Sequence, residues 1–238
     1  MIERGAEVIN YILGITPTRL EDLPAIFSGN GKNLFPYFLD VFNAMMKAQC
    51  VIFTSFYELE PQAIYTLKAT LPFPIYCVGP LIPHNTLDSI TNDANLEYFK
   101  WLDSQYASLG SFLSVLKEQM NEIIGGKRES GVRYFLVARG DTKQVQEACG
   151  EMGLVVPWCD QLKGLCHSSV GGFLTHCGWN STIEGVYAGS FMSLEGDEIK
   201  EMRRNSSKFK KACRQALSKG GSSETNLDAF VRETLKCQ

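Results

Sequence analysis

Short apolar segments alternate with longer segments of helical periodicity along most of the chain. Residues 34–48 carry apolar side chains three and four positions apart, which predicts an amphipathic helix. Residues 50–54 and 74–78 are short apolar runs, and residues 58–69 between them again show helical spacing. Strands that alternate with helices in this way are typical of a parallel sheet covered by helices. The pattern therefore predicts an α/β fold.

The same alternation returns after a polar segment that contains Pro80 and Pro83, which we interpret as a linker between two domains. Beyond it the pattern predicts a second α/β unit. Its expected strands are residues 133–138, 153–157 and 172–176. Its expected helices are residues 97–104, 114–129, a helix from Ser181, 196–219 and 223–236.

One strand of that second unit is missing from the pattern. A buried strand should open the unit before Leu109-Gly110-Ser111, but residues 101–108 are too polar for one. We therefore expect the first strand to be absent. Its loss would expose the edges of two neighbouring strands and remove part of the core.

The composition is that of an ordinary globular protein. The chain has 238 residues, of which 45% are hydrophobic and 21% charged, and its formal net charge is −3. No basic stripe indicates a nucleic-acid or anionic membrane partner. There is neither a secretory signal pattern nor an apolar run long enough to span a bilayer, so we expect a cytoplasmic protein. The eight cysteines are irregularly spaced and are expected to be reduced.

The candidate chemistry lies in a strand-to-helix turn. The strand expected at residues 172–176 runs into Gly178, which permits a tight turn, and then into a helix. Ser181 and Glu184 have the spacing of a capping box. The N-terminus of a helix offers free N–H groups and the positive end of its dipole, which suits a diphosphate, and His176 could donate to a phosphate oxygen. The turn alone leaves a purely structural role open, because many such turns bind nothing.

A metal site is a second interpretation of this stretch. The soft ligands available are Cys159, Cys166, His167, His176 and Cys177. Zinc sites usually pair their ligands at a spacing such as C-x-x-C, which is absent here. We therefore expect no metal.

A longer ordered pattern surrounds the turn. Its residues are Trp158, Gln161, Leu165, His167, Gly171, Phe173, His176-Cys177-Gly178-Trp179-Asn180-Ser181, Glu184 and Gly189. In order and spacing these residues resemble the signature box of plant secondary-product UDP-glycosyltransferases. The similarity extends to residues 78–81, 101–103 and 109–111, and to the Gly-Ser-Ser at residues 221–223.

The resemblance implies roles for individual residues. The position of Trp158 stacks on uracil, Gln161 contacts the uridine, and Glu184 binds ribose hydroxyls. A structural alternative stays open for two of them, because Trp158 could pack in the core and Glu184 could serve the capping box. The full implied UDP-sugar-binding set is Trp158, Gln161, His176, Gly178, Trp179, Asn180, Ser181, Glu184 and Ser111. Of the signature residues, His167 and Trp179 also suit an architectural role.

The chain also departs from the family pattern. The family's catalytic histidine, a general base in an early loop, has no counterpart, and His84 in the linker does not replace it; no catalytic residue is assigned. Beyond Gly189 the family continues with a strand, a loop and an acid–Gln pair that binds the sugar. Here Glu195 and Asp197 are out of register with that pair. Asp160 stands where the family usually has proline.

The resemblance implies an incomplete two-domain architecture of Rossmann-like parallel sheets with flanking helices. We expect residues 1–80 to be the remnant of an acceptor-binding domain, residues 81–100 a linker, and residues 101–238 an internally shortened UDP-sugar-binding domain. The implied function is transfer of a sugar, commonly glucose, from a UDP-sugar to a small hydroxylated acceptor, without metal or cofactor. Activity is expected to be impaired. The alternatives are a non-catalytic UDP-binding module, a partner of an intact relative, or a truncated product that does not function.

Overall fold

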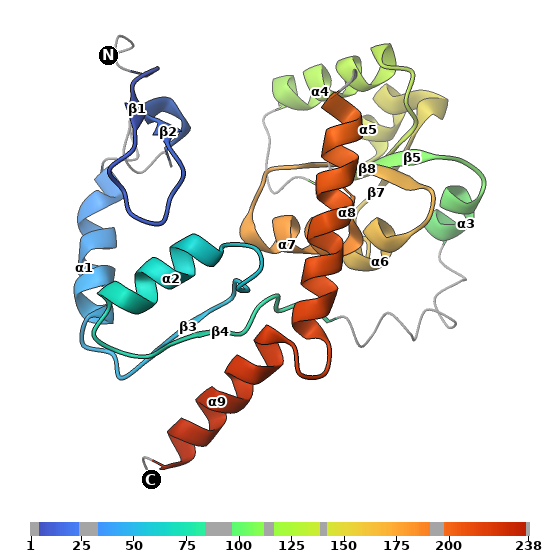
Figure 1. The fold of residues 1–238 in the computed structure, drawn as a ribbon. Coiled ribbons are helices and arrows are strands. Elements are labelled where there is room, and N and C mark those ends of the chain that lie inside the picture. Colours follow the sequence, from blue (N-terminus) through green and yellow to red (C-terminus); the bar gives the residue numbers. More distant parts are fainter. Residues whose placement is uncertain are drawn as a thin grey trace. The chain divides into compact units, whose positions relative to one another are not determined.

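The computed structural model describes residues 5–23, 33–83, 97–111, 117–138, 142–190 and 198–236. They belong to two compact units (Figure 1). Unit 1 comprises Met1–Leu81 and Gln215–Gln238, and unit 2 comprises Ile82–Arg214. Parallel strands and helices occur in both, which confirms the α/β prediction. Within the described residues, no helix is both long and apolar enough to cross a membrane.

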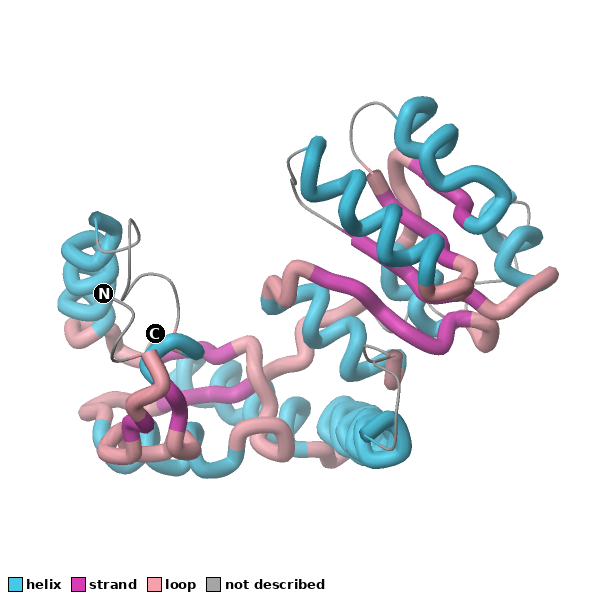
Figure 2. Tube along the Cα trace, turned by 90° about the horizontal axis from the view of Figure 1, so that it is seen from above, coloured by secondary structure: helices cyan, strands magenta, loops and turns pink. Residues whose placement is uncertain are grey.

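Unit 2 is built on a four-stranded parallel sheet. Its strands are β5 (Ala107–Ser111), β6 (Tyr134–Val137), β7 (Gly153–Val156) and β8 (Val170–Thr175), in the order β7-β6-β5-β8. Figure 2 shows them side by side with helices along both faces. The chain adds β6 and β7 on one side of β5 and then returns to place β8 on the other side. That reversal makes a topological switch point between β5 and β8, where open α/β sheets bind ligands beyond the strands' carboxyl ends.

The expectation that this unit lacks its first strand is wrong. β5 is that strand, and it lies at the centre of the sheet, where Leu109 pairs with Phe135 on one side and Phe173 on the other. Leu109 is fully buried, and the hydroxyl of the buried Ser108 accepts a hydrogen bond from Lys127 Nζ at 2.6 Å. The prediction failed because β5 is made of alanine, serine and glycine around a single leucine, so it lacks the apolar run expected of a buried strand.

The helices of unit 2 cover both faces of the sheet. They are α3 (Glu97–Asp103), α4 (Lys117–Glu129), α5 (Thr142–Cys149), α6 (Gln161–Cys166), α7 (Trp179–Ala188) and α8 (Glu198–Leu217), the last of which extends into unit 1. Side chains alternate between the two faces of a strand. Accordingly Phe135 packs with Tyr98 of α3 and Leu165 of α6, whereas its neighbour Tyr134 packs with Ile124 of α4. The sequence did not predict α5 or α6.

The C-terminal end of α7 is held by α8. Gly189 ends α7 in the left-handed conformation, with φ of 75°. Lys210 Nζ of α8 donates to the carbonyl of Ala188 at 2.7 Å, and Ser206 Oγ donates to that of Gly189 at 2.7 Å. These bonds satisfy terminal carbonyls, and the ammonium complements the helix dipole.

Unit 1 contains a short antiparallel hairpin, a two-stranded parallel sheet, three α-helices and a 3-10 helix among its described residues. Its elements are β1 (Val8–Ile9), β2 (Thr18–Arg19), the 3-10 helix η1 (Leu20–Asp22), α1 (Phe35–Met45), β3 (Val51–Phe53), α2 (Pro61–Thr70), β4 (Ile75–Cys77) and α9 (Ser222–Lys236). The predicted helices and strands between residues 34 and 78 are thus confirmed, whereas the hairpin of β1 and β2 was not predicted.

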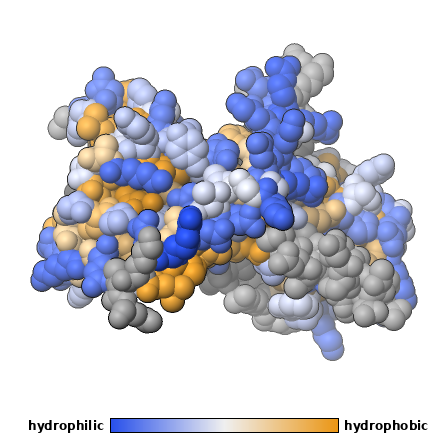
Figure 3. Space-filling model, turned by 60° about the horizontal axis from the view of Figure 1, so that its bottom comes forward, coloured by the Kyte–Doolittle hydropathy of each residue, from blue (hydrophilic) through white to orange (hydrophobic). Residues whose placement is uncertain are grey.

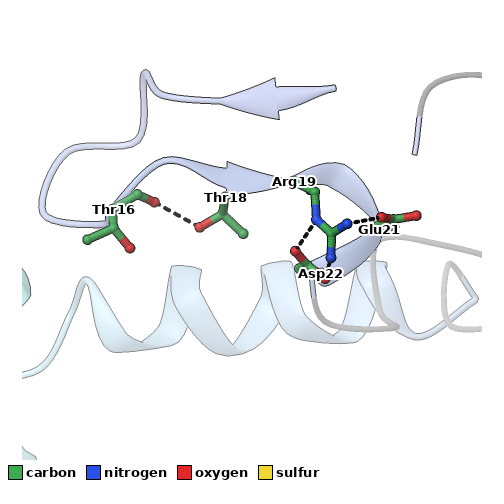
Figure 4. Close-up of polar contacts among 5 residues, drawn as sticks. All are labelled: Thr16, Thr18, Arg19, Glu21 and Asp22. Atoms are coloured by element: carbon green, nitrogen blue, oxygen red, sulfur yellow. Dashed lines mark hydrogen bonds and ion pairs between the residues drawn. The ribbon is translucent and has the colours of Figure 1, made fainter. Parts of the chain in front are cut away.

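Charged side chains fasten the end of that hairpin to the following turn (Figure 4). The guanidinium of Arg19 donates to both carboxylate oxygens of Asp22, at 2.8 and 3.0 Å, and lies 2.7 Å from Glu21. Thr18 Oγ1 donates to the carbonyl of Thr16 at 2.8 Å. All these groups are exposed, so they shape the turn more than they stabilise the unit.

The last helix differs from its predicted place. The sequence assigned residues 101–238 to one domain, but α9 packs in unit 1 against β4. The Phe230 ring meets Tyr76 edge-on with centroids 5.5 Å apart, and Ser222 Oγ donates to Glu58 at 2.8 Å. Periodicity predicts that α9 is a helix, but it cannot say which sheet the apolar face of that helix covers.

Some sequence expectations fall outside the described residues. They concern His84 in the linker and the segment after Ser190 that contains Glu195 and Asp197.

Candidate functional site

The carboxyl edge of the unit 2 sheet places three predicted site residues on one side of the fold. Ser111 is the last residue of β5 and pairs with Thr175 of β8. His176 directly follows Thr175, and Trp158 follows the end of β7 by two residues. Since all four strands are parallel, these positions share one edge, and Ser111 and His176 flank the switch point.

The backbone of the turn between β8 and α7 differs from the prediction. Gly178 has φ −61° and ψ 145°, a conformation open to most residues. The left-handed residue is Cys177, with φ of 59°, and its amide donates to Thr175 Oγ1 at 3.2 Å. A Cβ at position 178 would lie 2.4 Å from Nε2 of the exposed His176, so a larger residue there would require the imidazole to move. A non-glycine residue with positive φ is typical of a functional turn.

The predicted capping box does not form. Gly178 is the N-cap and α7 begins at Trp179, so Ser181 already lies inside the first turn and Glu184 in the second. Within the described residues no side chain caps α7. The first N–H groups of a helix have no partner within the helix, so this end can receive an anion.

The side chain of Gln161 joins two residues of α7 into one polar cluster. Gln161 Nε2 donates to Glu184 Oε2 at 2.6 Å and to Ser181 Oγ at 3.3 Å. Gln161 is the first residue of α6, whose N-cap Asp160 accepts a hydrogen bond from the amide of Lys163 at 3.1 Å. α6 connects β7 to β8 and packs against α7, which brings Gln161 and Glu184, 23 positions apart, into contact.

The carboxyl group of Glu184 lies in a partly desolvated site. Burial raises its pKa above the ordinary value, and the charge of Asp160 raises it further, while donation from Gln161 lowers it. From the sequence, Asp160 is only a departure from the usual proline, and its effect on the pKa of Glu184 is not evident. An aspartate directly before a helix is a recognisable N-cap signal.

Exposure separates the two interpretations of Trp158. Its side chain is 67% exposed, so the alternative of core packing is wrong. The indole is available for stacking on a planar ring. Trp179, Asn180 and His176 are also exposed at the start of α7.

His167 and Asp103 form a pair at the amino edge of the sheet, opposite the edge that carries the candidate site. His167 Nε2 is 3.1 Å from Asp103 Oδ1, and its ring stacks on Phe99 of α3 with centroids 5.9 Å apart. His167 precedes β8, so this pair lies at the amino edge of the strands. It fastens α3 to the start of β8 and takes no part in the candidate site.

A zinc site has no support in the described part of the chain. There, no three His, Cys, Asp or Glu side chains gather in a way that could hold a metal ion. Cys159 is buried, and burial raises the pKa of its thiol to about 12, whereas Cys177 is exposed on the turn.

Comparisons with known proteins point in one direction. Residues 104–226 match the family model "UDP-glucoronosyl and UDP-glucosyl transferase". UDP-glycosyltransferase 87A1 of Arabidopsis thaliana is 40% identical over 286 residues, covering 97% of this chain and 65% of that protein. A UDP-glucosyltransferase from Polygonum tinctorium, capable of glucosylating indoxyl, is similar in structure with a TM-score of 0.82 and 28% identity, covering 96% of this chain and 64% of that one. The structure of Phytolacca americana UGT2, complexed with UDP-2fluoro-glucose and pterostilbene, is similar with a TM-score of 0.80 and 26% identity. The match covers 97% of this chain and 63% of that one.

These relatives are longer than this chain. The chain spans 65% of the Arabidopsis protein. That alignment runs over 286 residues although the chain has 238, so it must contain positions that have no counterpart within this chain. The relatives therefore carry internal residues that are absent here.

Proposed function

Because this chain belongs to the UDP-glucoronosyl and UDP-glucosyl transferase family, we propose that the carboxyl edge of the unit 2 sheet binds the UDP part of a UDP-sugar. The observation that carries the proposal is the cluster of Gln161, Ser181 and Glu184 beside the start of α7. It is polar, partly buried and adjacent to a helix N-terminus at a topological switch point.

Each part of UDP has a chemically suitable partner. The exposed indole of Trp158 offers a face for uracil. The carboxylate of Glu184 can accept hydrogen bonds from ribose hydroxyls, with Gln161 holding it in place. The amides of Trp179 to Ser181, with the side chains of His176 and Asn180, suit the diphosphate, and Ser111 lies at the adjacent strand end. No metal or cofactor enters this scheme.

For the complete reaction we propose transfer of a sugar, glucose from UDP-glucose being the proposed case, to a small hydroxylated acceptor in plant secondary metabolism. Small aromatic molecules such as pterostilbene and indoxyl, named with the relatives, indicate the size of acceptor. We place acceptor binding in residues 1–80 and the reaction in the cytoplasm. We propose that turnover depends on a positioned general base, a group that typically contributes roughly 10²–10⁴-fold to the rate.

A second candidate is UDP binding without transfer. It is favoured by the positions of two histidines, because His167 pairs with Asp103 away from the site and His176 lies beside Gly178 in the turn proposed for the diphosphate.

The test is calorimetric titration of the whole chain with UDP. We expect saturable binding that Trp158→Ala and His176→Ala each weaken. Tyr106→Ala is the matched control, because Tyr106 is an exposed aromatic residue at the amino end of β5, and it should leave binding unchanged. A folded chain that does not bind UDP would refute the proposal. Adding UDP-glucose with a phenolic acceptor and assaying glucoside then separates transfer from binding alone.

A further inference from the structure

Asp160 directly precedes Gln161, the residue whose side chain joins Ser181 and Glu184 into the polar cluster. Asp160 is the N-cap of α6, and its Oδ1 accepts a hydrogen bond from the amide of Lys163 at 3.1 Å. Its Oδ2 lies 3.8 Å from the ammonium group of the buried Lys163 side chain. The hydrogen bond is the closer of these two contacts, and it fixes the first turn of the helix.

The backbone of Asp160 is also fastened to the core of unit 2. Its amide donates a long hydrogen bond of 3.4 Å to the hydroxyl of Tyr98, a buried residue whose ring stacks on Phe135 with centroids 5.3 Å apart. Asp160 has a φ of −71°, which proline also adopts, but proline has neither an N–H group nor a carboxylate. The proline usual in the family would fit this backbone and supply neither bond.

The cap matters because α6 is short. The helix spans six residues, Gln161–Cys166, and a helix of that length does not persist in water on its own. Residues 162–165 are buried, whereas Gln161 and Cys166 at the two ends are only partly buried. Asp160 therefore acts at a less buried end of the helix, and that end carries Gln161.

The position of Gln161 matters because its amide nitrogen makes two hydrogen bonds. Nε2 donates to Glu184 Oε2 at 2.6 Å and to Ser181 Oγ at 3.3 Å, and a side-chain amide has two N–H donors. A displaced first turn of α6 would lengthen both bonds and release the carboxylate of Glu184. That carboxylate is the group proposed for the ribose hydroxyls, so the ribose is the part of UDP that would lose its partner.

We propose that Asp160 is a positioning residue of the nucleotide site: its cap on α6 holds Gln161, and through Gln161 the carboxylate of Glu184, in the orientation that accepts the ribose hydroxyls. Asp160 thereby strengthens the preference for a nucleotide that carries those hydroxyls. The capping oxygen has this effect and the charge does not, because the charge of Asp160 raises the pKa of Glu184 and so disfavours its ionised form. This inference rests on the proposed function, which assigns the ribose contact to Glu184.

The experiment compares the affinity of the whole chain for UDP with its affinity for dideoxy-UDP, which lacks both ribose hydroxyls. Calorimetry is done in mildly alkaline buffer, where Glu184 is ionised in every variant. Asp160→Ala should lower the affinity for UDP roughly three- to tenfold and that for dideoxy-UDP less than about twofold. Asp160→Asn should restore the preference for UDP, because its side-chain oxygen still caps the helix.

Asp103→Ala is the matched control. It removes a carboxylate that also pairs with a side chain of unit 2, but at the amino edge of the sheet, and it should leave both affinities unchanged. The Asp160 side chain is 33% exposed, so Asp160→Ala opens no sealed cavity and should fold, which circular dichroism checks.

The outcomes separate this inference from the proposed function. A folded wild-type chain that binds neither nucleotide would refute both. A wild-type chain that prefers UDP, together with an Asp160→Ala variant that keeps the same preference, would overturn the role of Asp160 alone. Equal losses for the two nucleotides in Asp160→Ala would also overturn it, because they would indicate a general disturbance of unit 2. Failure of Asp160→Asn to restore the preference would rule out the cap as the cause.

Discussion

Units 1 and 2 use the same kind of local structure but differ in how completely they bury it. In unit 2, Leu109 and Phe135 are fully buried between neighbouring strands, and helices cover both faces of the sheet. In unit 1, Phe38 is 39% exposed on a helix that buries nothing, and Figure 3 shows apolar atoms (orange) at the surface on the side where Figure 1 draws α1. The candidate site lies in the unit whose layers are complete. Local periodicity predicts elements of the same kind in both units, but how well each element is stabilised depends on the layers that pack around it.

The largest expected effect is a difference in the free energy of unfolding between matched Phe→Ala variants in the two units. Phe135→Ala should lower the free energy of unfolding of unit 2 by about 3–5 kcal/mol, because it removes a fully buried ring. Phe38→Ala, a matched change in unit 1, should change stability by less than about 0.5 kcal/mol. Denaturant unfolding followed by circular dichroism measures both. Equal losses would show that α1 is packed as tightly as β6.

The next effect concerns the polar cluster. Glu184→Ala should weaken UDP binding by roughly 10–150-fold, because hydrogen bonds to a charged group contribute about 1.5–3 kcal/mol. Glu147→Ala on the exposed side of α5 is the control and should leave the dissociation constant unchanged. Calorimetry compares the two. Equal affinities would remove Glu184 from the ribose site.

A smaller effect is expected at the end of α7. Lys210→Met should destabilise unit 2 by about 1 kcal/mol, since it removes the hydrogen bond to the carbonyl of Ala188 and the charge at the helix C-terminus. The neighbouring exposed Lys211 gives the control variant Lys211→Met. Thermal unfolding of both should distinguish them, and identical melting temperatures would contradict the capping role.

The smallest effect is on pH dependence. Burial raises the pKa of Glu184, so its carboxylate takes up a proton at a higher pH than an exposed glutamate does. If the ionised form binds ribose, UDP affinity should fall as the pH is lowered toward that raised pKa. Glu184→Gln lacks this titration, while protonation of the UDP phosphate affects both proteins alike. Parallel pH profiles for the two would contradict the assignment.

The sequence predicted the site better than it predicted the surrounding fold. The order of the signature residues placed Gln161, Ser181 and Glu184 in one set, and the structure brings their side chains together. The sequence could not distinguish a capping box from this polar cluster, because Ser181 and Glu184 have the same spacing in both. The position of the helix start, one turn earlier, decides between them.

Other errors share a physical cause. β5 was missed because its small residues are buried by neighbours that are distant in sequence, such as Phe173. α9 was assigned to the wrong unit because its partner Tyr76 lies more than a hundred residues away. Both of these features depend on contacts between residues that are distant in the sequence, and the local sequence pattern carries no information about such contacts. Gly178 was singled out for a tight turn, but its backbone is extended and the left-handed residue of the turn is Cys177.

Hydrogen exchange of the whole chain, measured with and without UDP, is the most direct test of a nucleotide site at the carboxyl edge of the unit 2 sheet. We expect amides of β5, β6 and β8 to exchange slowly and those of β3 to exchange faster, and we expect UDP to slow exchange in residues 158–166 and 176–184. Protection by UDP that appears in unit 1, or in neither unit, would contradict a nucleotide site at the carboxyl edge of the unit 2 sheet.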